Sequence, residues 1–227
     1  MSADPPLILD VDGTLTRPDG HGIDPRIFEP LAGWEAPVVI ATGKAFPYPV
    51  ALCHFLALPE LVVAENGGVV YTGERIISAG DRAGAEAVAR EYEAAGHALG
   101  WRGADTVNRW RETELAVSRD QPLEPLAAIA ADHGLEVVDT GYAYHVKDPA
   151  ISKGAGLDEL AAAIDLDLEH CVAVGDSAND VSTFARAGES YAVANADEAA
   201  REAADERLEA THADGTLAVL DRVAGTR

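Results

Sequence analysis

The 227-residue chain is short of lysine, cysteine and long hydrophobic runs. Its lysines are Lys44, Lys147 and Lys153, and 39 acidic residues against 17 basic ones give a net charge of −22. Such a surface repels nucleic-acid phosphates and anionic lipid headgroups, so we expect no nucleic-acid partner and no role at a membrane surface. An ordinary acidic protein is one interpretation. The scarcity of lysine favours the other, a halophilic protein from a high-salt cytoplasm in which screening makes dense carboxylates tolerable.

Two cysteines, Cys53 and Cys171, are too few for a disulfide scaffold and lack the spacing of a metal site. Both lie in apolar stretches, so we expect buried free thiols. No run of 18 apolar residues occurs, and the N-terminus has no basic region or cleavage signal. These features predict a cytoplasmic protein.

Short apolar runs, each followed by a polar or glycine cluster, occur toward both ends of the chain. They lack alternation and are rich in Val, Ile and Leu, as are parallel strands covered on both faces. The runs are residues 6–11, 37–41, 61–64, 171–174 and 191–194. Helical spacing of Leu157, Leu160 and Ile164 lies between two of them. The alternation predicts an α/β fold with a Rossmann-like, doubly wound parallel sheet, in which functional groups gather beyond the carboxyl ends of the strands.

The middle of the chain follows a different pattern. Two strand candidates, residues 135–139 and 142–147, flank Thr140-Gly141, which predicts a hairpin turn. Helix-like stretches at 81–96 and 123–133 precede them. A hairpin inside a βα-patterned chain indicates an inserted α+β unit.

This change of pattern sets the predicted domains. We expect a catalytic core from residues 1–77 and 151–227, with a small α+β cap domain, residues 78–150, over the end of its sheet. The alanine-rich segment 194–204 is predicted to be a helix.

Carboxylates follow the first predicted strand, in Leu9-Asp10-Val11-Asp12-Gly13. Side chains two residues apart on an extended chain point the same way, and glycine then permits a sharp turn. This motif alone is as typical of a plain loop as of an active site, so its interpretation depends on the other strand ends.

A hydroxyl and a lysine stand at two further positions. Thr42, in Ala41-Thr42-Gly43-Lys44, either bonds a phosphoryl oxygen or merely caps a turn. Lys153 opens a predicted helix, where the helix dipole disfavours a cation. That placement indicates an anion nearby, although a solvated lysine is the alternative.

More acids follow the fourth run, in Gly175-Asp176-Ser177-Ala178-Asn179-Asp180. Asp176 and Asp180 are four residues apart and can share one face of a helical turn, or serve only as N-caps. Several carboxylates in one crevice repel each other unless a cation lies among them. Hard oxygen ligands point to Mg²⁺.

These four segments, in this order, resemble the signature motifs of the haloacid dehalogenase superfamily of phosphohydrolases. The resemblance runs from Asp10 to Asp180 and leaves the middle as the cap. It implies that Asp10 attacks phosphorus and forms an aspartyl-phosphate, and that Asp12 is the general acid and base. It also implies that Thr42 and Lys153 hold the phosphoryl oxygens.

The same resemblance implies a Mg²⁺ site. Its ligands would be Asp10, the backbone carbonyl of Asp12, and Asp176, with Asp180 binding directly or through other groups. Ser177 and Asn179 would support them.

Three segments narrow the resemblance. Glu65-Asn66-Gly67-Gly68 is similar to the branch with an α/β cap, while residues 108–112 and 141–145 resemble the archaeal phosphoglycolate phosphatases. This implies hydrolysis of a small phosphate monoester, 2-phosphoglycolate, to glycolate and phosphate, a step of carbohydrate metabolism, by a monomer or homodimer. Gly43, Lys44, Arg109 and Arg111 are then expected to bind substrate. His145 is either a substrate ligand or, as we favour, an ordinary hairpin histidine.

Alternatives from two classes remain. Among enzymes, a sugar-phosphate or mannosyl-phosphoglycerate phosphatase has the same core motifs. Among signalling proteins, a phosphoacceptor receiver domain also uses an aspartate, a hydroxyl, a lysine and Mg²⁺, but it is shorter and has no cap. The Asp12 carboxylate argues against it, because that group promotes turnover. A dinucleotide-binding module is disfavoured, because no Gly-x-Gly-x-x-Gly sequence follows a predicted strand in this chain.

Overall fold

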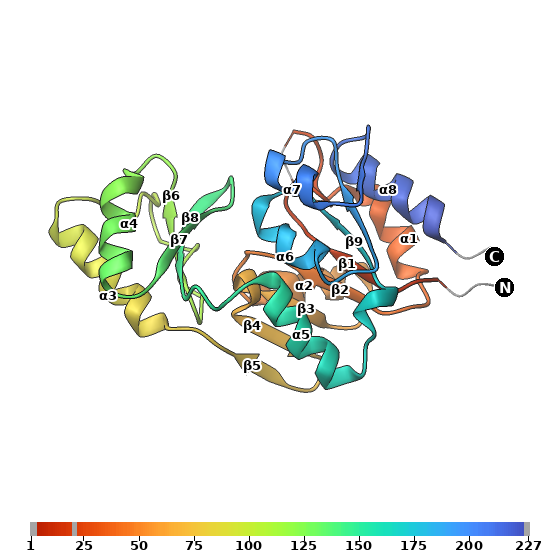
Figure 1. Cartoon of the computed structure of the whole chain (residues 1–227), viewed down its shortest axis with the longest axis horizontal. Coiled ribbons are helices and arrows are strands. Elements are labelled where there is room, and N and C mark those ends of the chain that lie inside the picture. The colour runs from red at the N-terminus through yellow and green to blue at the C-terminus, as the bar shows by residue number, and fades with distance from the viewer. Residues whose placement is uncertain (1–3, 20–21, 225–227) are drawn as a thin grey trace.

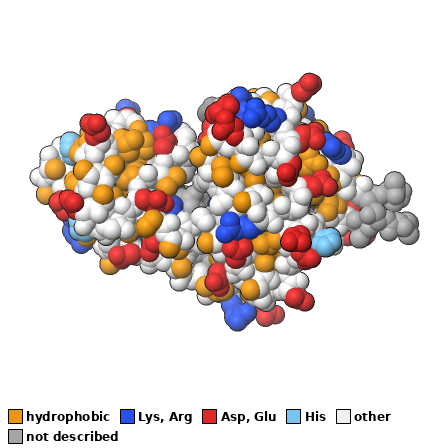
Figure 2. All heavy atoms as spheres, in the orientation of Figure 1, with side chains coloured by type: hydrophobic (Ala, Val, Ile, Leu, Met, Phe, Trp, Pro, Cys, Tyr) orange, Lys and Arg blue, Asp and Glu red, His pale blue; other side chains and the backbone are white. Residues whose placement is uncertain are grey.

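The computed structural model describes residues 4–19 and 22–224 of the chain. It has two lobes, and the larger one contains the first and the last described residues (Figure 1). None of the described helices combines the length and apolar character needed to cross a bilayer. Acidic side chains are spread over the visible face of both lobes, with fewer basic ones between them (Figure 2).

An eight-stranded sheet forms the larger lobe. In spatial order its strands are β11 (Glu206–Arg207), β10 (Glu189–Ala192), β9 (Val172–Gly175), β1 (Leu7–Leu9), β2 (Val38–Ala41), β3 (Leu61–Ala64), β4 (Val69–Thr72) and β5 (Ile76–Ser78). The strands from β11 to β3 are parallel, and β4 and β5 are antiparallel to their neighbours. Chain order reverses beside β1, where Leu7 pairs with Val38 on one side and Val172 on the other. The doubly wound α/β fold is therefore confirmed.

Helices cover both faces of this sheet. One face carries α1 (Phe28–Ala32), α2 (Pro47–Leu56) and α8 (His212–Val223), while the other carries α5 (Lys153–Ile164), α6 (Val181–Phe184) and α7 (Glu198–Ala203). This double cover explains why the strands read as continuous apolar runs. Cys53 and Cys171 are buried and free, as predicted, and burial raises the pKa of both thiols, to about 12 and about 11.

The smaller lobe has its own antiparallel sheet in the order β6 (Leu115–Ser118), β8 (Ala143–Lys147), β7 (Glu136–Asp139). Helices α3 (Arg82–Ala94) and α4 (Leu123–Asp132) pack against it through apolar side chains. The predicted hairpin is present: Gly141 has a φ of +77°, and Asp139 pairs with Tyr144 across the turn. Short 3-10 segments elsewhere are η1 (Pro25–Ile27), η2 (Glu65–Gly67), η3 (Leu168–His170) and η4 (Ala178–Asp180).

One predicted helix is wrong in extent. Within 194–204 only α7 is helical, because the Asp197 carboxylate accepts the backbone N–H of Ala200 at 2.9 Å and starts the helix there. Alanine content alone did not reveal this cap.

Candidate active site

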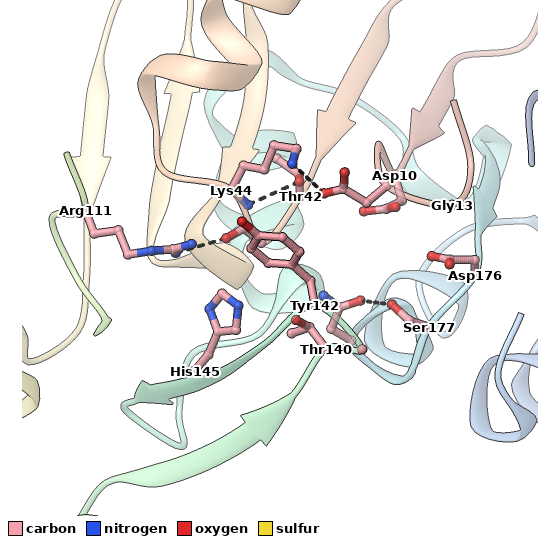
Figure 3. A pocket seen from close by; sticks show the side chains of 14 residues that line it. Asp10, Gly13, Thr42, Lys44, Arg111, Thr140, Tyr142, His145, Asp176 and Ser177 are labelled. Carbon is pink, nitrogen blue, oxygen red and sulfur yellow. Dashed lines mark hydrogen bonds and ion pairs between the residues drawn. The ribbon is translucent and has the colours of Figure 1, made fainter. Parts of the chain in front are cut away.

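Four neighbouring parallel strands end at the same edge of the large sheet. Asp10 follows β1, Thr42 follows β2, Glu65 follows β3 and Asp176 follows β9. Three of these residues, Asp10, Thr42 and Asp176, line a cavity of about 320 Å³ together with the hairpin turn of the smaller lobe (Figure 3). The sheet's topology thus brings together motifs that are far apart in sequence.

Lys153 lies at the centre of the acidic cluster. Its side chain is fully buried, and its Nζ donates to Asp10 Oδ1 at 2.7 Å and to Asp180 Oδ1 at 2.6 Å. Burial alone would lower the pKa of Lys153, but the charges of Asp10 and Asp180 raise it above its ordinary value. The lysine is therefore a buried cation and is not solvated.

The second carboxylate oxygen of Asp180, Oδ2, also accepts hydrogen bonds. Its Oδ2 accepts the backbone N–H groups of Asp176 and Ser177 at 3.0 and 3.1 Å, and Ser177 forms a capping box with it. Ser177 is the N-cap of this turn and Asp180 is its N3 partner, so the carboxylate that stabilises the start of the turn also binds Lys153.

Asp10, Asp176 and Asp180 can each place one carboxylate oxygen within 4.8 Å of the others. Burial raises the pKa of both Asp10 and Asp176 well above the ordinary value, and neighbouring acids raise both further. Gly13, with a φ of +78°, lets the chain pass so close to Asp176 that a Cβ would lie 2.0 Å from Oδ2. Lys153 alone does not balance three carboxylates, so this oxygen-rich donor set fits a divalent cation.

Asp12 and Lys44 form an ion pair at the cavity wall. The Nζ of Lys44 lies 2.7 Å from Asp12 Oδ2 and 5.6 Å from the centre of the Tyr142 ring. The backbone N–H of Lys44 donates to the Thr42 hydroxyl at 3.2 Å. Gly43 and Ser177 also line the cavity, and Asn179 accepts the Ser177 hydroxyl at 2.8 Å.

Arg111 enters the cavity from the opposite side, beside His145 (Figure 3). The Nη1 of Arg111 donates to the backbone carbonyl of Gly43 at 3.0 Å and forms a short ion pair with Glu114. The hairpin residues Thr140, Gly141 and Tyr142 complete this wall.

The structure does not bring Arg109 to this cavity. Arg109 is exposed and lines a separate hollow with Arg82 and Asp105. It is two residues from Arg111 in an irregular segment whose Asn108 side chain is fixed by Asp105 and Ala116. That anchoring leaves the two arginines facing different hollows, and only Arg111 lines the cavity described above.

Several buried site residues were missed or undervalued from sequence. His145 lies in the hairpin strand β8, where it is 2% exposed and also lines the cavity. Glu114 and Asn66 are buried beside it, and Glu65 accepts the backbone N–H groups of Glu112 and Thr113. The Glu65-Asn66-Gly67-Gly68 motif, which follows a buried strand and resembles the branch with an α/β cap, was the available signal.

Comparison with known proteins identifies the family. A family model for haloacid dehalogenase-like hydrolases matches residues 7–93 and 130–220. The chain belongs to this family. Family members generally use a divalent metal, which agrees with the acidic cluster.

Relatives resemble the chain over nearly its full length. Proteins named phosphoglycolate phosphatase from two halophilic archaea, Halobacterium salinarum and Natronomonas pharaonis, are each 57% identical to it. The first match covers 98% of both chains, and the second covers 98% of this chain and 99% of the relative.

Solved structures share the fold. A protein from Thermoplasma acidophilum has a TM-score of 0.81 at 21% identity and covers 98% of this chain and 99% of its own. A haloacid dehalogenase-like hydrolase from Bacteroides thetaiotaomicron has a TM-score of 0.77 at 19% identity and covers 97% of this chain and 99% of its own.

Proposed function

We propose that the chain is a Mg²⁺-dependent phosphatase that hydrolyses 2-phosphoglycolate to glycolate and phosphate through an aspartyl-phosphate on Asp10. The observation that carries the proposal is the buried cluster in which Lys153 binds Asp10 and Asp180 beside Asp176, at the end of four parallel strands. The names and high identity of the archaeal relatives support this choice of substrate.

The carboxylates of Asp10 and Asp176 and the backbone carbonyl of Asp12 would hold the metal. Hydrogen bonds already engage both oxygens of Asp180, whereas none reaches the Asp176 carboxylate among the described residues. Asp180 therefore acts mainly by orienting Lys153 and the turn at Asp176. When bound, Mg²⁺ supplies positive charge that offsets the phosphoryl group and the crowded acids.

The reaction has two displacements. Asp10 forms a bond to phosphorus while the bond to the glycolate oxygen breaks, and Asp12 gives that oxygen a proton. Water then attacks the aspartyl-phosphate and gives a proton to Asp12. This second displacement breaks the bond between Asp10 and phosphorus, releases phosphate and restores the Asp10 carboxylate. Thr42 and Lys153 hold the phosphoryl oxygens, so most of the catalysis is positioning and charge neutralisation.

The smaller lobe supplies the other wall of the cavity. We assign residues 1–77 and 151–227 to the catalytic core and 78–150 to the cap. Lys44 and Arg111 face the cavity from the two sides, where they can meet the leaving group. At about 320 Å³ the cavity suits a small ester better than an extended one.

A hydrolysis screen tests the function. We expect phosphoglycolate to be cleaved faster than glucose 6-phosphate or phenyl phosphate, with Mg²⁺ and in multimolar KCl. Faster cleavage of the hexose phosphate would contradict the substrate while retaining the phosphatase, and no hydrolysis of any monoester would reject both.

The cellular setting is part of the same proposal. We assign a cytoplasmic location, which suits two buried free thiols, and a monomer or homodimer without nucleic-acid partners. Fractionation and light scattering in high salt test these assignments.

A further inference from the structure

The chemistry proposed above leaves one charge of phosphoglycolate without a partner, namely its carboxylate. From the contacts around Arg111 we infer that Arg111 and His145 form a carboxylate subsite, and that Asn66 and Glu114 hold it in position. This inference rests on the proposed function and names the groups that select its substrate.

Arg111 makes its contacts within the protein through one guanidinium nitrogen and keeps a buried donor without a partner. Its side chain is 3% exposed, and Nη1 makes the contacts to both Gly43 and Glu114. Its Nε is buried without any hydrogen-bond partner. A buried donor without a partner is costly, and the Nε–Nη2 edge of arginine binds carboxylates bidentately. Because Arg111 lines the cavity, the partner we infer for its guanidinium is a substrate carboxylate bound there.

His145 stands next to Arg111 and shares its anchor. The Nδ1 of His145 lies 2.7 Å from Glu114 Oε1, so it donates to the carboxylate and leaves Nε2 to the cavity. Burial alone would raise the pKa of Glu114, but the charges of His145 and Arg111 lower it below its ordinary value. One ionised carboxylate therefore sets the position of both proposed ligands.

Asn66 connects this anchor to the catalytic core. Its Nδ2 donates to Glu114 Oε2 at 2.9 Å, and its Oδ1 accepts Nδ2 of Asn179 at 3.0 Å. Asn179 in turn accepts the hydroxyl of Ser177, beside the metal-binding cluster. These hydrogen bonds fix the position of the subsite relative to the acids that act on the phosphoryl group.

The backbone at this point is specialised for that task. Glu65 and Asn66 both adopt positive φ, +51° and +56°, although neither is glycine. Asn66 is 1% exposed, and Gly67 passes so close to Ser152 that a Cβ would lie 1.9 Å from its carbonyl oxygen. Such strained, buried backbone persists where surrounding contacts over-determine it, and it is typical of functional sites. We therefore assign to the Glu65-Asn66-Gly67-Gly68 motif the positioning of Asn66, which supports the subsite.

Isosteric substitution of Asn66 tests the inference. Asn66→Asp keeps the acceptor for Asn179 but puts an oxygen against Glu114, so it should displace Arg111 and His145. The readout is kcat/KM for phosphoglycolate divided by kcat/KM for phenyl phosphate, which has no carboxylate. We expect this ratio to fall about tenfold or more, mainly through KM for phosphoglycolate. Asn66→Gly, which tolerates positive φ, should lower the ratio in the same direction.

A second substitution distinguishes positioning from damage. In the double variant Asn66→Asp with Glu114→Gln, residue 114 becomes the donor and residue 66 the acceptor of their mutual hydrogen bond. The kcat/KM ratio of the double variant should therefore be higher than the value predicted by multiplying the effects of the two single substitutions. Arg109→Ala, the matched loss of a nearby cation outside the cavity, should leave the ratio unchanged. An equal fall for both substrates in the Asn66 variants, or no recovery in the double variant, would overturn the subsite while the phosphatase stands. If neither ester is hydrolysed by the parent protein, the proposed function fails and the subsite falls with it.

Discussion

The two walls of the cavity are built on different principles. On the core side, Asp10, Thr42 and Asp176 each occupy the end of a parallel strand, so the regular sheet brings them together. On the opposite side, Arg111 and Glu114 come from an irregular segment and meet His145 of β8 through side-chain contacts. Chemistry common to a family can reside on the regular wall, and substrate choice on the irregular one.

Charge separates the walls as well. The core side gathers Asp10, Asp12, Asp176 and Asp180 around two lysines, so it is short of positive charge. The opposite side pairs Arg111 with Glu114 internally but leaves Arg111 Nε without a partner. The first wall therefore requires a cation, and the second can accept an anion. Perturbing each wall should give a different kind of defect.

The largest effect is expected from the core wall. Asp10→Asn removes the nucleophile and should lower kcat by on the order of 10⁶ for every substrate, as loss of the nucleophile does in other covalent enzymes. The amide is nearly isosteric, and Lys153 keeps its ion pair with Asp180, so Tm at matched salt should be retained. Steady-state kinetics with phosphoglycolate and phenyl phosphate measure this, and appreciable residual turnover of pure protein would contradict the covalent route.

Removal of the metal should lower the rate of hydrolysis nearly as much as Asp10→Asn does, and to the same extent for every substrate. Chelation should abolish hydrolysis of both esters, because the acids around Asp10 and Asp176 are then uncompensated. Mg²⁺ should restore activity, whereas Ca²⁺ should do so poorly, because its coordination is larger and looser. Activity is assayed after dialysis and re-addition of each ion, and full activity in excess chelator would rule out the proposed site.

The opposite wall should give a smaller and selective defect. Arg111→Ala should raise KM for phosphoglycolate by roughly 10- to 100-fold, corresponding to about 1.5–3 kcal/mol for a charge-assisted bond, and should raise KM for phenyl phosphate less. Arg109→Ala is the matched control and should change neither constant, because Arg109 faces another hollow. If Arg109→Ala gave the larger change, the assignment of the two arginines would be reversed.

The same contrast explains what sequence could predict. Asp10, Thr42 and Asp176 directly follow strands and Lys153 begins helix α5, so strand and helix patterns place them at one sheet edge. Arg109 and Arg111 have no such regular context. Which of them faces the cavity depends on Asp105 and Glu114, whose contacts the segment's pattern does not reveal.

The position of His145 at the cavity could not be predicted for a related reason. Alternation along β8 places it on one face of the small sheet, but whether that face meets solvent or the core depends on how the two lobes sit together. The strands β4 and β5 were also not predicted, although residues 69–72 and 76–78 form a short hairpin at the sheet edge.

The smallest expected effect is one in which the two walls should not differ. With a net charge of −22, self-repulsion should destabilise the fold in dilute buffer, and salt should relieve it. The Debye length falls from about 10 Å at 0.1 M salt to about 3 Å at 1 M, so repulsion between surface acids of both lobes weakens together. A gain of about 1 kcal/mol corresponds to roughly 2–4 °C in Tm for a chain of this size. Thermal denaturation from low to multimolar KCl should therefore show a rising Tm. The Tm of the Arg111→Ala variant should rise with KCl by the same amount as that of the parent protein. A flat or falling Tm would contradict salt adaptation, and it would leave the assignments of the two walls intact.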